Sequence, residues 1–313
     1  MMRLYLFLFL LLSLSLMSNF CSPDEKNTAS LDNNRHQSTD STEFDLKNKA
    51  YFSCTYMGEK PPADIPLKFA PGVVSTKKDD SCFEVSVTGE EILFSRDGNI
   101  LITKQNQNGK WDLPSPAFEG FEPSFSKDGR KIYFNSRAPI PGSKVANNVW
   151  YSEKLNGQWA KPNYLTGAVL DQVMHAPSIA INGNMYASGI TCLKYQNGKY
   201  GKAEKLNPPI TGYHPFVSAD ESFIIFDKKP PDSGYGADLY ITFRKPDSTW
   251  TKPAWLGDKI NTDKLETNAS VTADKKFMFF TRNFDIYWVK ADFINQISKE
   301  LGIKSQFLSS NDK

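Results

Sequence analysis

The chain has few of the residues that usually carry catalytic or metal-binding chemistry. Its 313 residues include only three histidines and four cysteines, and no cysteine spacing resembles a zinc site. The sequence contains neither a G-x-S-x-G nucleophile motif nor an H-E-x-x-H metalloprotease motif. We therefore expect no metal and no cofactor, and we assign no catalytic residue.

A charge excess of either sign is also missing. The 37 basic and 35 acidic side chains give a net charge of +2, and no dense Lys/Arg cluster marks a polyanion site. Nucleic acid is therefore not expected as a partner. Hydrophobic residues make up 40% of the chain, and its 19 glycines and 19 prolines indicate a turn-rich β protein with enough material for a core.

The chain repeats one pattern five times. Each copy is an apolar strand, a turn and a second apolar strand: CFEVSVTGEEILFSR, EPSFSKDGRKIYFNSR, HAPSIAINGNMYASG, HPFVSADESFIIFDKK and TNASVTADKKFMFF. If Val85, Pro123, Pro177, Pro215 and Ala269 are taken as equivalent, the copies are 38, 54, 38 and 54 residues apart. A fixed unit of this size predicts a repeat architecture.

Each unit continues with two further strands. The third begins at Asn148, Asp238 or Asp285, and an Asn-Gly or Asp-Ser turn then leads into an aromatic strand such as NGQWAKPNYL. Asn-Gly between alternating strands favours a type I′ hairpin. The sequence thus predicts an all-β fold, a β-propeller of four-stranded blades.

The two ends of the repeat region predict how the ring closes. The fifth unit stops after its third strand, DIYWV, whereas the segment at 65–75 has the spacing of an isolated fourth strand. We expect this segment to complete the last blade of a five-bladed ring, which leaves no free sheet edge in the ring. A six-bladed ring, with a degenerate blade in 44–80, is the alternative. The expected propeller covers 49–292, and 293–313 forms a short helix and tail.

The first residues resemble an export signal. Met1, Met2 and Arg3 precede the apolar run 4–17, which is short for a membrane span and typical of a signal peptide over 1–20. Cys21 follows, and the segment resembles a bacterial lipoprotein signal in which this cysteine is acylated, although Phe20 departs from the small residue usual there. The alternative is an ordinary cleaved signal with Cys21 incidental.

The segment 21–48 is polar and predicts a disordered tether. Lipidation would place the protein in the cell envelope, at the outer membrane or the periplasmic face, and in contact with the membrane through the lipid alone. Without it, the protein would be soluble in the periplasm or secreted. Cys54 and Cys82 could form a disulfide there, or they could be two separate thiols; Cys192 is expected in the core.

The repeat carries a family resemblance. The run PSFSKDGRKIYF, followed by NVWYSEK, NGQW and KPNYL, is similar to the WD-repeat-like blade of the TolB-like bacterial propellers, over 60–292. The resemblance implies a monomeric binding scaffold that contacts other envelope proteins. This implication is an analogy of fold, because the shared residues are turn and core positions.

The candidate ligand site follows from the repeat. Residues just before the equivalent positions should surround one end of the central channel, and the polar and aromatic ones are Glu84, Glu122, His175, Tyr213, His214 and Asn268. The simpler alternative is that these side chains bind backbone groups and water in the channel.

Two functions fit this site. The first is a binding module that contacts an envelope protein or a glycan at the channel mouth or on the loop face, where the loops at 138–148 and 229–237 lie. The second is a glycan-active enzyme, a glycoside hydrolase or lyase. That enzyme would use Glu84 and Glu122 as paired carboxylates and Trp111, Trp150 and Trp159 as stacking faces. Against this, the tryptophans occupy repeat-equivalent strand positions, where packing within the blades explains them.

Overall fold

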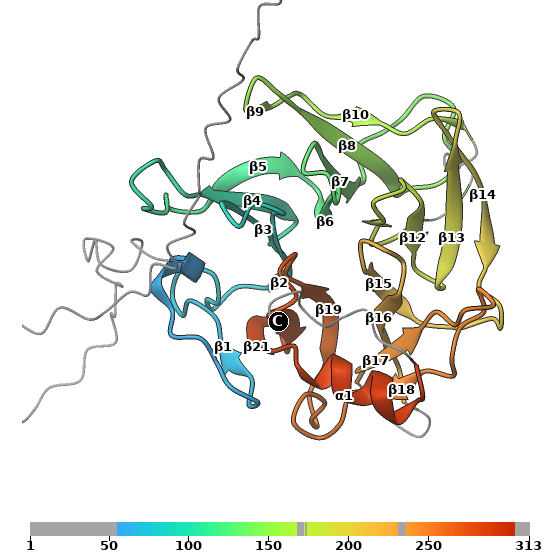
Figure 1. Cartoon of the computed structure of the whole chain (residues 1–313). Coiled ribbons are helices and arrows are strands. Elements are labelled where there is room, and N and C mark those ends of the chain that lie inside the picture. Colours follow the sequence, from blue (N-terminus) through green and yellow to red (C-terminus); the bar gives the residue numbers. More distant parts are fainter. Residues whose placement is uncertain (1–54, 168–171, 173, 231–235, 304–313) are drawn as a thin grey trace, which may run out of the picture. The chain divides into compact units, whose positions relative to one another are not determined.

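The computed structural model describes residues 55–167, 172, 174–230 and 236–303. These residues form five antiparallel sheets arranged around a common centre, a five-bladed β-propeller (Figure 1). The all-β prediction with five blades is confirmed. The six-bladed alternative is wrong, because the described part of 44–80 contains a 3₁₀ helix (Thr55–Gly58), one two-residue strand (Leu67–Lys68) and the start of the first blade instead of a further sheet.

The blades follow one another along the chain. Blade 1 contains β2 (Asp80–Val85), β3 (Glu91–Arg96), β4 (Asn99–Lys104) and β5 (Ser115–Glu119). Blade 2 contains β6 (Phe121–Phe125), β7 (Lys131–Ser136), β8 (Asn148–Leu155) and β10 (Asn163–Tyr164), with β9 (Gln158–Trp159) paired to β8. Blade 3 contains β11 (Ser178–Ile179), β12 (Met185–Ala187), β13 (Thr191–Gln196) and β14 (Lys199–Lys205).

Blade 4 contains β15 (Tyr213–Val217), β16 (Phe223–Lys228), β17 (Asp238–Phe243) and β18 (Ala254–Trp255). Blade 5 contains β19 (Glu266–Val271), β20 (Phe277–Arg282), β21 (Asp285–Lys290) and, from the other end of the chain, β1 (Leu67–Lys68). The helix α1 (Phe293–Glu300) follows β21.

The second strand of a typical blade is buried on both faces. In β3, β7, β16 and β20 nearly every residue is buried, and large apolar side chains such as Phe94, Phe134 and Phe226 are fully enclosed. These strands are continuous apolar runs because neighbouring blades pack against both sides of them. The core is therefore a series of apolar layers between blades, and the central channel is lined by both polar and apolar residues.

The ring is closed on the inside and on the outside. On the inside, β2 contacts β6 and β19, β11 contacts β6 and β15, and β15 contacts β19. On the outside, β1 pairs with β21 through Leu67 and Trp288, and the amide of Phe69 donates to the carbonyl of Ile286 over 2.8 Å. The predicted closure by the N-terminal strand is confirmed, although the paired segment is much shorter than 65–75.

Phe69 explains why so short a strand suffices. Its ring is fully buried, with ring centres of Phe83, Phe279 and Trp288 at 5.0, 5.1 and 5.2 Å. This aromatic cluster joins the N-terminal segment to blades 1 and 5, and edge-to-face contacts of this kind add to the burial of apolar area.

The two Asn-Gly hairpins in blades 2 and 3 have the predicted turn. Asn156 and Gly157 both have positive φ (50° and 79°), and so do Asn197 and Gly198 (52° and 78°), as type I′ turns require. In the Asn108-Gly109 turn of blade 1 only the glycine is left-handed, at 71°, and its amide donates to the carbonyl of Asn106 instead. The same dipeptide therefore closes two different kinds of turn.

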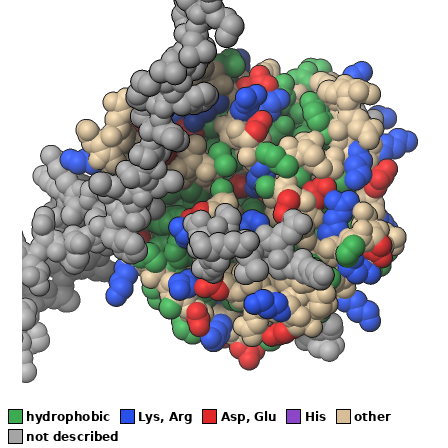
Figure 2. Space-filling view, in the orientation of Figure 1, with side chains coloured by type: hydrophobic (Ala, Val, Ile, Leu, Met, Phe, Trp, Pro, Cys, Tyr) green, Lys and Arg blue, Asp and Glu red, His purple; other side chains and the backbone are tan. Residues whose placement is uncertain are grey.

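Several expectations for the N-terminal region lie outside the described residues. Cys21 and Cys54 fall in 1–54, so acylation and a Cys54–Cys82 disulfide remain predictions. Cys192 is buried in blade 3, as expected. A search of the described residues finds no helix with the length and hydrophobicity needed to span a membrane. On the face drawn in Figure 2, basic and acidic side chains are interspersed, in keeping with the balanced charge.

Candidate functional site

One left-handed residue lies near the start of each innermost strand. These residues come one from each blade and have φ between 42° and 55°: Cys82, Glu122, Ala176, His214 and Asn268. In β2, β6, β15 and β19 the strand register shifts at this residue, which marks a β-bulge. A bulge re-aims its side chain, and here all five line the central channel.

The positions of the bulges show that the sequence repeat was aligned incorrectly in the first unit. Their spacing is 40, 54, 38 and 54 residues, so Phe83, not Val85, is equivalent to Pro123. Both residues are apolar, and the first unit has no proline to fix the position, so the hydrophobic pattern alone could not separate them. As a result Cys82, not Glu84, occupies the blade 1 position of the ring.

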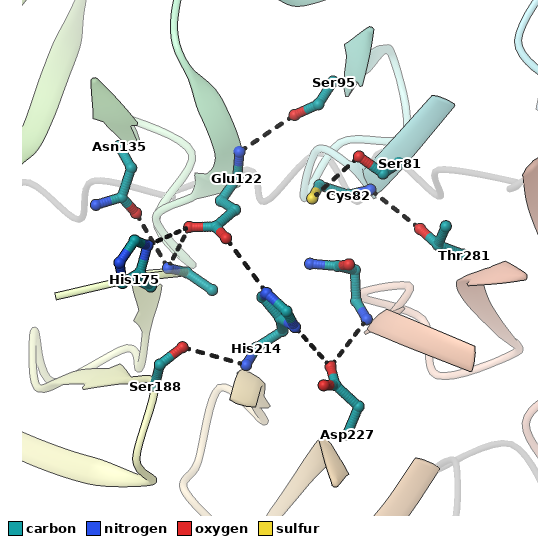
Figure 3. Close-up of polar contacts among 12 residues, drawn as sticks. Ser81, Cys82, Ser95, Glu122, Asn135, His175, Ser188, His214, Asp227 and Thr281 are labelled. Atoms are coloured by element: carbon teal, nitrogen blue, oxygen red, sulfur yellow. Dashed lines mark hydrogen bonds and ion pairs between the residues drawn. The ribbon is translucent and has the colours of Figure 1, made fainter. Parts of the chain in front are cut away.

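The amide of each bulge residue is held by the preceding blade. The acceptors are side-chain oxygens near the ends of the second strands, at 3.0 to 3.4 Å, in the pairs Cys82–Thr281, Glu122–Ser95, Ala176–Asn135, His214–Ser188 and Asn268–Asp227. The hydrogen bonds form a closed circle around the channel (Figure 3). Our sequence analysis missed these acceptors, although each is a polar residue that follows three apolar residues, as in IIFD and MFFT.

Within this circle, His214 lies between two carboxylates. Its Nδ1 is 2.8 Å from Asp227 Oδ1 and its Nε2 is 3.3 Å from Glu122 Oε1. The other oxygen of Glu122 accepts the amide of Ala176 at 2.7 Å and lies 3.7 Å from His175 Nδ1. Figure 3 shows Glu122 in the middle of this network, between the two histidines. Three blades are thus joined through one glutamate.

The network fixes the charges of its members. Burial by itself would lower the pKa of His214, but the charge of Asp227 and hydrogen bonds to Asp227 and Glu122 outweigh it and raise this pKa to about 10. Burial by itself would raise the pKa of Glu122, but hydrogen bonds from His175, His214 and Ala176 lower it to about 2. At neutral pH the histidine is an imidazolium and the glutamate a carboxylate.

Glu84 lines the same channel but is engaged elsewhere. Its carboxylate accepts the amide of Phe125 at 2.8 Å and lies 2.9 Å from Lys127 Nζ. Lys127 Nζ also lies 4.6 Å from the centre of the Phe216 ring. Glu84 therefore links blades 1 and 2 and does not join the Glu122 network.

The remaining candidates lie at or beside the channel mouth. We define the mouth as the ring of residues that directly precede the bulges, which are Ser81, Phe121, His175, Tyr213 and Thr267. Tyr213 is 58% exposed, and its ring centre is 6.3 Å from that of His214. Asn268 lines the channel below the mouth, with its amide bound to Asp227. Five of the six predicted residues thus lie in or beside the Glu122 network, whereas Glu84 lines the channel with partners of its own.

The channel is narrow. Its free volume is about 40 Å³, room for about three water molecules and far below the several hundred Å³ of a typical small-molecule site. A search of the described residues finds no group of three or more His, Cys, Asp or Glu side chains placed to hold a metal ion. A larger ligand can therefore contact the mouth but cannot enter the channel.

The three tryptophans assigned to sugar stacking are parts of the blades. Trp111 is 5% exposed and belongs to the core beside β1. Trp159 donates from Nε1 to Glu91 over 3.2 Å, and Trp150 packs edge-on against Tyr164. All three hold neighbouring strands together, in agreement with the interpretation that blade packing explains these tryptophans.

Comparison with known proteins gives matches at the level of structure only. No protein-family model matches the chain, and no curated protein matches its sequence. Among solved structures, a proposed TolB from Agrobacterium tumefaciens is 10% identical, with a TM-score of 0.42 over 66% of this chain and 70% of that one. TolB from Acinetobacter baumannii is 13% identical, with a TM-score of 0.41 over 70% and 59%.

The GH43 protein BlXynB from Bacillus licheniformis is also similar. It is 12% identical, with a TM-score of 0.48 over 69% of this chain and 51% of that one. For the last two proteins, the similar part is less than two thirds of their own length. The fold of the chain itself therefore defines its class, which is a β-propeller module.

Proposed function

We propose that this protein is a binding module of the cell envelope that contacts a protein or glycan ligand at the mouth of its channel. The observation that carries the proposal is the mouth itself. Phe121, His175 and Tyr213 form an arc over three consecutive blades, and the small Ser81 and Thr267 complete the circle. Aromatic side chains held on a rigid scaffold are typical anchors of binding surfaces.

The rigidity of the arc comes from the circle of hydrogen bonds below it. Each mouth residue directly precedes a bulge whose amide is held by the preceding blade. Such a scaffold loses little conformational entropy when a ligand binds. The loop before β8 supports the arc as well, because Asn147 Nδ2 lies 3.4 Å from His175 Nε2.

The same geometry disfavours a hydrolase built on Glu84 and Glu122. A glycosidase needs one carboxylic acid whose raised pKa keeps it protonated near neutral pH. The pKa of Glu122 is instead lowered to about 2, and its oxygens are occupied by His214, His175 and Ala176. Glu84 is neutralised by Lys127. Glu122 is therefore not available to protonate a leaving group, and both oxygens of Glu84 are engaged by Phe125 and Lys127.

A matched pair of variants tests the binding face. Tyr213 and Ile181 are both 58% exposed, but Tyr213 begins β15 whereas Ile181 lies in the turn after β11, at the other end of its blade. The full chain with Tyr213→Ala should lose retention of envelope proteins or glycan-array signal by at least fivefold, and Ile181→Ala should keep it. Equal behaviour of the two variants would refute the mouth as the contact surface.

We propose further that Cys21 is acylated and that 22–48 tethers the propeller to the membrane. The apolar run before Cys21 and the polar segment after it support this proposal. Cys21→Ser should move the protein from the membrane fraction to the soluble envelope fraction and abolish labelling by a fatty-acid probe. A variant that stays in the membrane fraction would show that another segment is the anchor.

A further inference from the structure

Blades 5 and 1 neutralise a basic residue at the mouth end of their second strands. Arg96 Nε lies 2.5 Å from Asp80 Oδ1, and Arg282 Nε lies 2.8 Å from Glu266 Oε1. Each acid is on the first strand of the same blade, two residues before the bulge. Both acids are fully buried, so each arginine is tied to its own blade.

Blades 2 and 4 have glycine where those acids stand. A side chain cannot replace either one, because a Cβ at Gly212 would lie 2.4 Å from the Phe226 ring and a Cβ at Gly120 would lie 2.5 Å from the carbonyl of Asn135. The close approach of the first strand to the second thus excludes an internal acid. A basic residue at the end of the second strand must find its counter-charge elsewhere.

Two basic residues occupy these blade ends. Lys228 is equivalent to Arg96 and Arg282, and Arg137 follows β7. Among the described residues neither one makes an ion pair. The cross-strand neighbour of Lys228 is Asp238, whose carboxylate accepts Trp255 Nε1 at 2.7 Å. Glu119, close to Phe121 in the sequence, makes no ion pair with Arg137.

Both cations adjoin the aromatic arc. The guanidinium of Arg137 lies over the ring of Phe121, with its carbon 5.4 Å from the ring centre, and the Phe121 ring is 6.4 Å from that of His175. Lys228 directly follows Asp227, which pairs with Tyr213 across β15 and β16. Arg137 is exposed, and stacking on a ring leaves the N–H groups at its edge free to bind a planar carboxylate through two hydrogen bonds.

From this charge imbalance we infer that the mouth selects an acidic peptide segment, whose carboxylates pair with Arg137 and Lys228 while Tyr213 supplies the apolar contact. The inference rests on the proposed function and names its ligand. A peptide is favoured over a sugar because the guanidinium already covers Phe121, and the narrow channel admits no sugar ring. Arginine beside exposed tyrosine is also typical of protein–protein contacts.

Three labelled peptides of equal length, which alternate tyrosine with glutamate, glutamine or lysine, test the inference against the full chain. Binding is measured by fluorescence anisotropy at low and at high salt. The glutamate peptide should bind about tenfold more tightly than the glutamine peptide, and the difference should shrink at high salt. Arg137→Gln should remove most of the difference. Arg130→Gln should not, because Arg130 is an equally charged, exposed residue in the turn between β6 and β7.

The outcomes separate this inference from the proposed function. Equal affinity for the glutamate and glutamine peptides, with binding lost in Tyr213→Ala, would overturn the charge selection and leave the mouth as the binding face. The charge selection would also be overturned if Arg137→Gln and Arg130→Gln reduced the preference for the glutamate peptide equally. If an oligogalacturonate displaces the labelled glutamate peptide at a lower concentration than the unlabelled glutamate peptide does, the carboxylates that the mouth recognises belong to a glycan. If no peptide binds, the selection of an acidic peptide is wrong, and the comparison of Tyr213→Ala with Ile181→Ala still decides whether the mouth is the binding face.

Discussion

Replacement of His214 by glutamine should destabilise the propeller in a strongly pH-dependent way. His214 is the cation between Glu122 and Asp227, and its side chain is 26% exposed. Glutamine preserves polarity but leaves two partly buried carboxylates facing each other without a positive charge. Breaking a buried pair in this manner costs about 3–5 kcal/mol.

The pKa of His214 sets the size and the sign of the effect. Its rise from 6.5 to about 10 corresponds to at most about 5 kcal/mol of folding free energy, and solvent screening at a side chain that is one quarter exposed reduces this to about 3 kcal/mol. Because the folded-state pKa is raised, the contribution is complete below pH 6.5 and is lost as the pH rises towards 10. The contribution of the lowered pKa of Glu122 is complete above about pH 4.5 and is lost as the pH falls towards 2.

Urea unfolding of the wild type and of His214→Gln at pH 6, 7.5, 9 and 10 measures this difference. We expect about 3 kcal/mol at pH 6 and less than about 1 kcal/mol at pH 10. His175→Gln is the control. The Nδ1 atom of His175 lies farther from Glu122, at 3.7 Å, and its side chain is more exposed, so this substitution should lower the free energy of unfolding by less than about 1 kcal/mol. A stability difference that does not change between pH 6 and pH 10 would refute the assignment of His214 as a buried cation.

Three other changes test the ring and its packing. Thr281→Val leaves the amide of Cys82 without an acceptor and should lower the free energy of unfolding by about 1–3 kcal/mol. Gly212→Ala places a methyl group against the ring of Phe226 and should cost about 1–3 kcal/mol in urea unfolding. A chain that begins at Ser81 loses β1 and the buried Phe69 and should unfold over a broad temperature range by calorimetry.

Each of these changes has a control or a contrary outcome. Gly201 also has an ordinary φ, and its nearest atom to an added Cβ is 3.7 Å away, so Gly201→Ala should change stability by less than about 0.5 kcal/mol. Thr249→Val removes only an exposed hydrogen bond to Asp247 within a turn, and it should also change the free energy of unfolding by less than about 0.5 kcal/mol. A truncated chain that melts as sharply as the full one would disprove closure by the N-terminal strand.

The fold was predictable because its signal is repeated. Five copies of one hydrophobic pattern, two Asn-Gly hairpins and a fourth strand displaced to the other end of the chain all agree, and each is confirmed. The length of the closing strand was not predictable. It depends on the burial of Phe69 among rings from blades 1 and 5, which is a contact between distant parts of the sequence.

The site was predictable in place but not in detail. Its location followed from the repeat, whereas the error at Glu84 followed from a hydrophobic pattern that cannot distinguish Phe83 from Val85. The partners of His214 could not be inferred either. Asp227 is on the second strand and Glu122 is in another blade, so their meeting depends on the bulge geometry that turns His214 into the channel.

Site-specific photo-crosslinking in living cells tests the central claim most directly. A photoreactive phenylalanine analogue is placed at Tyr213, at the mouth, or at Ile181, at the other end of a blade, and crosslinked species are identified by mass spectrometry. The account predicts a discrete crosslinked partner from position 213 and none from position 181. A partner captured from position 181 alone would contradict it and move the binding face to the opposite end of the channel.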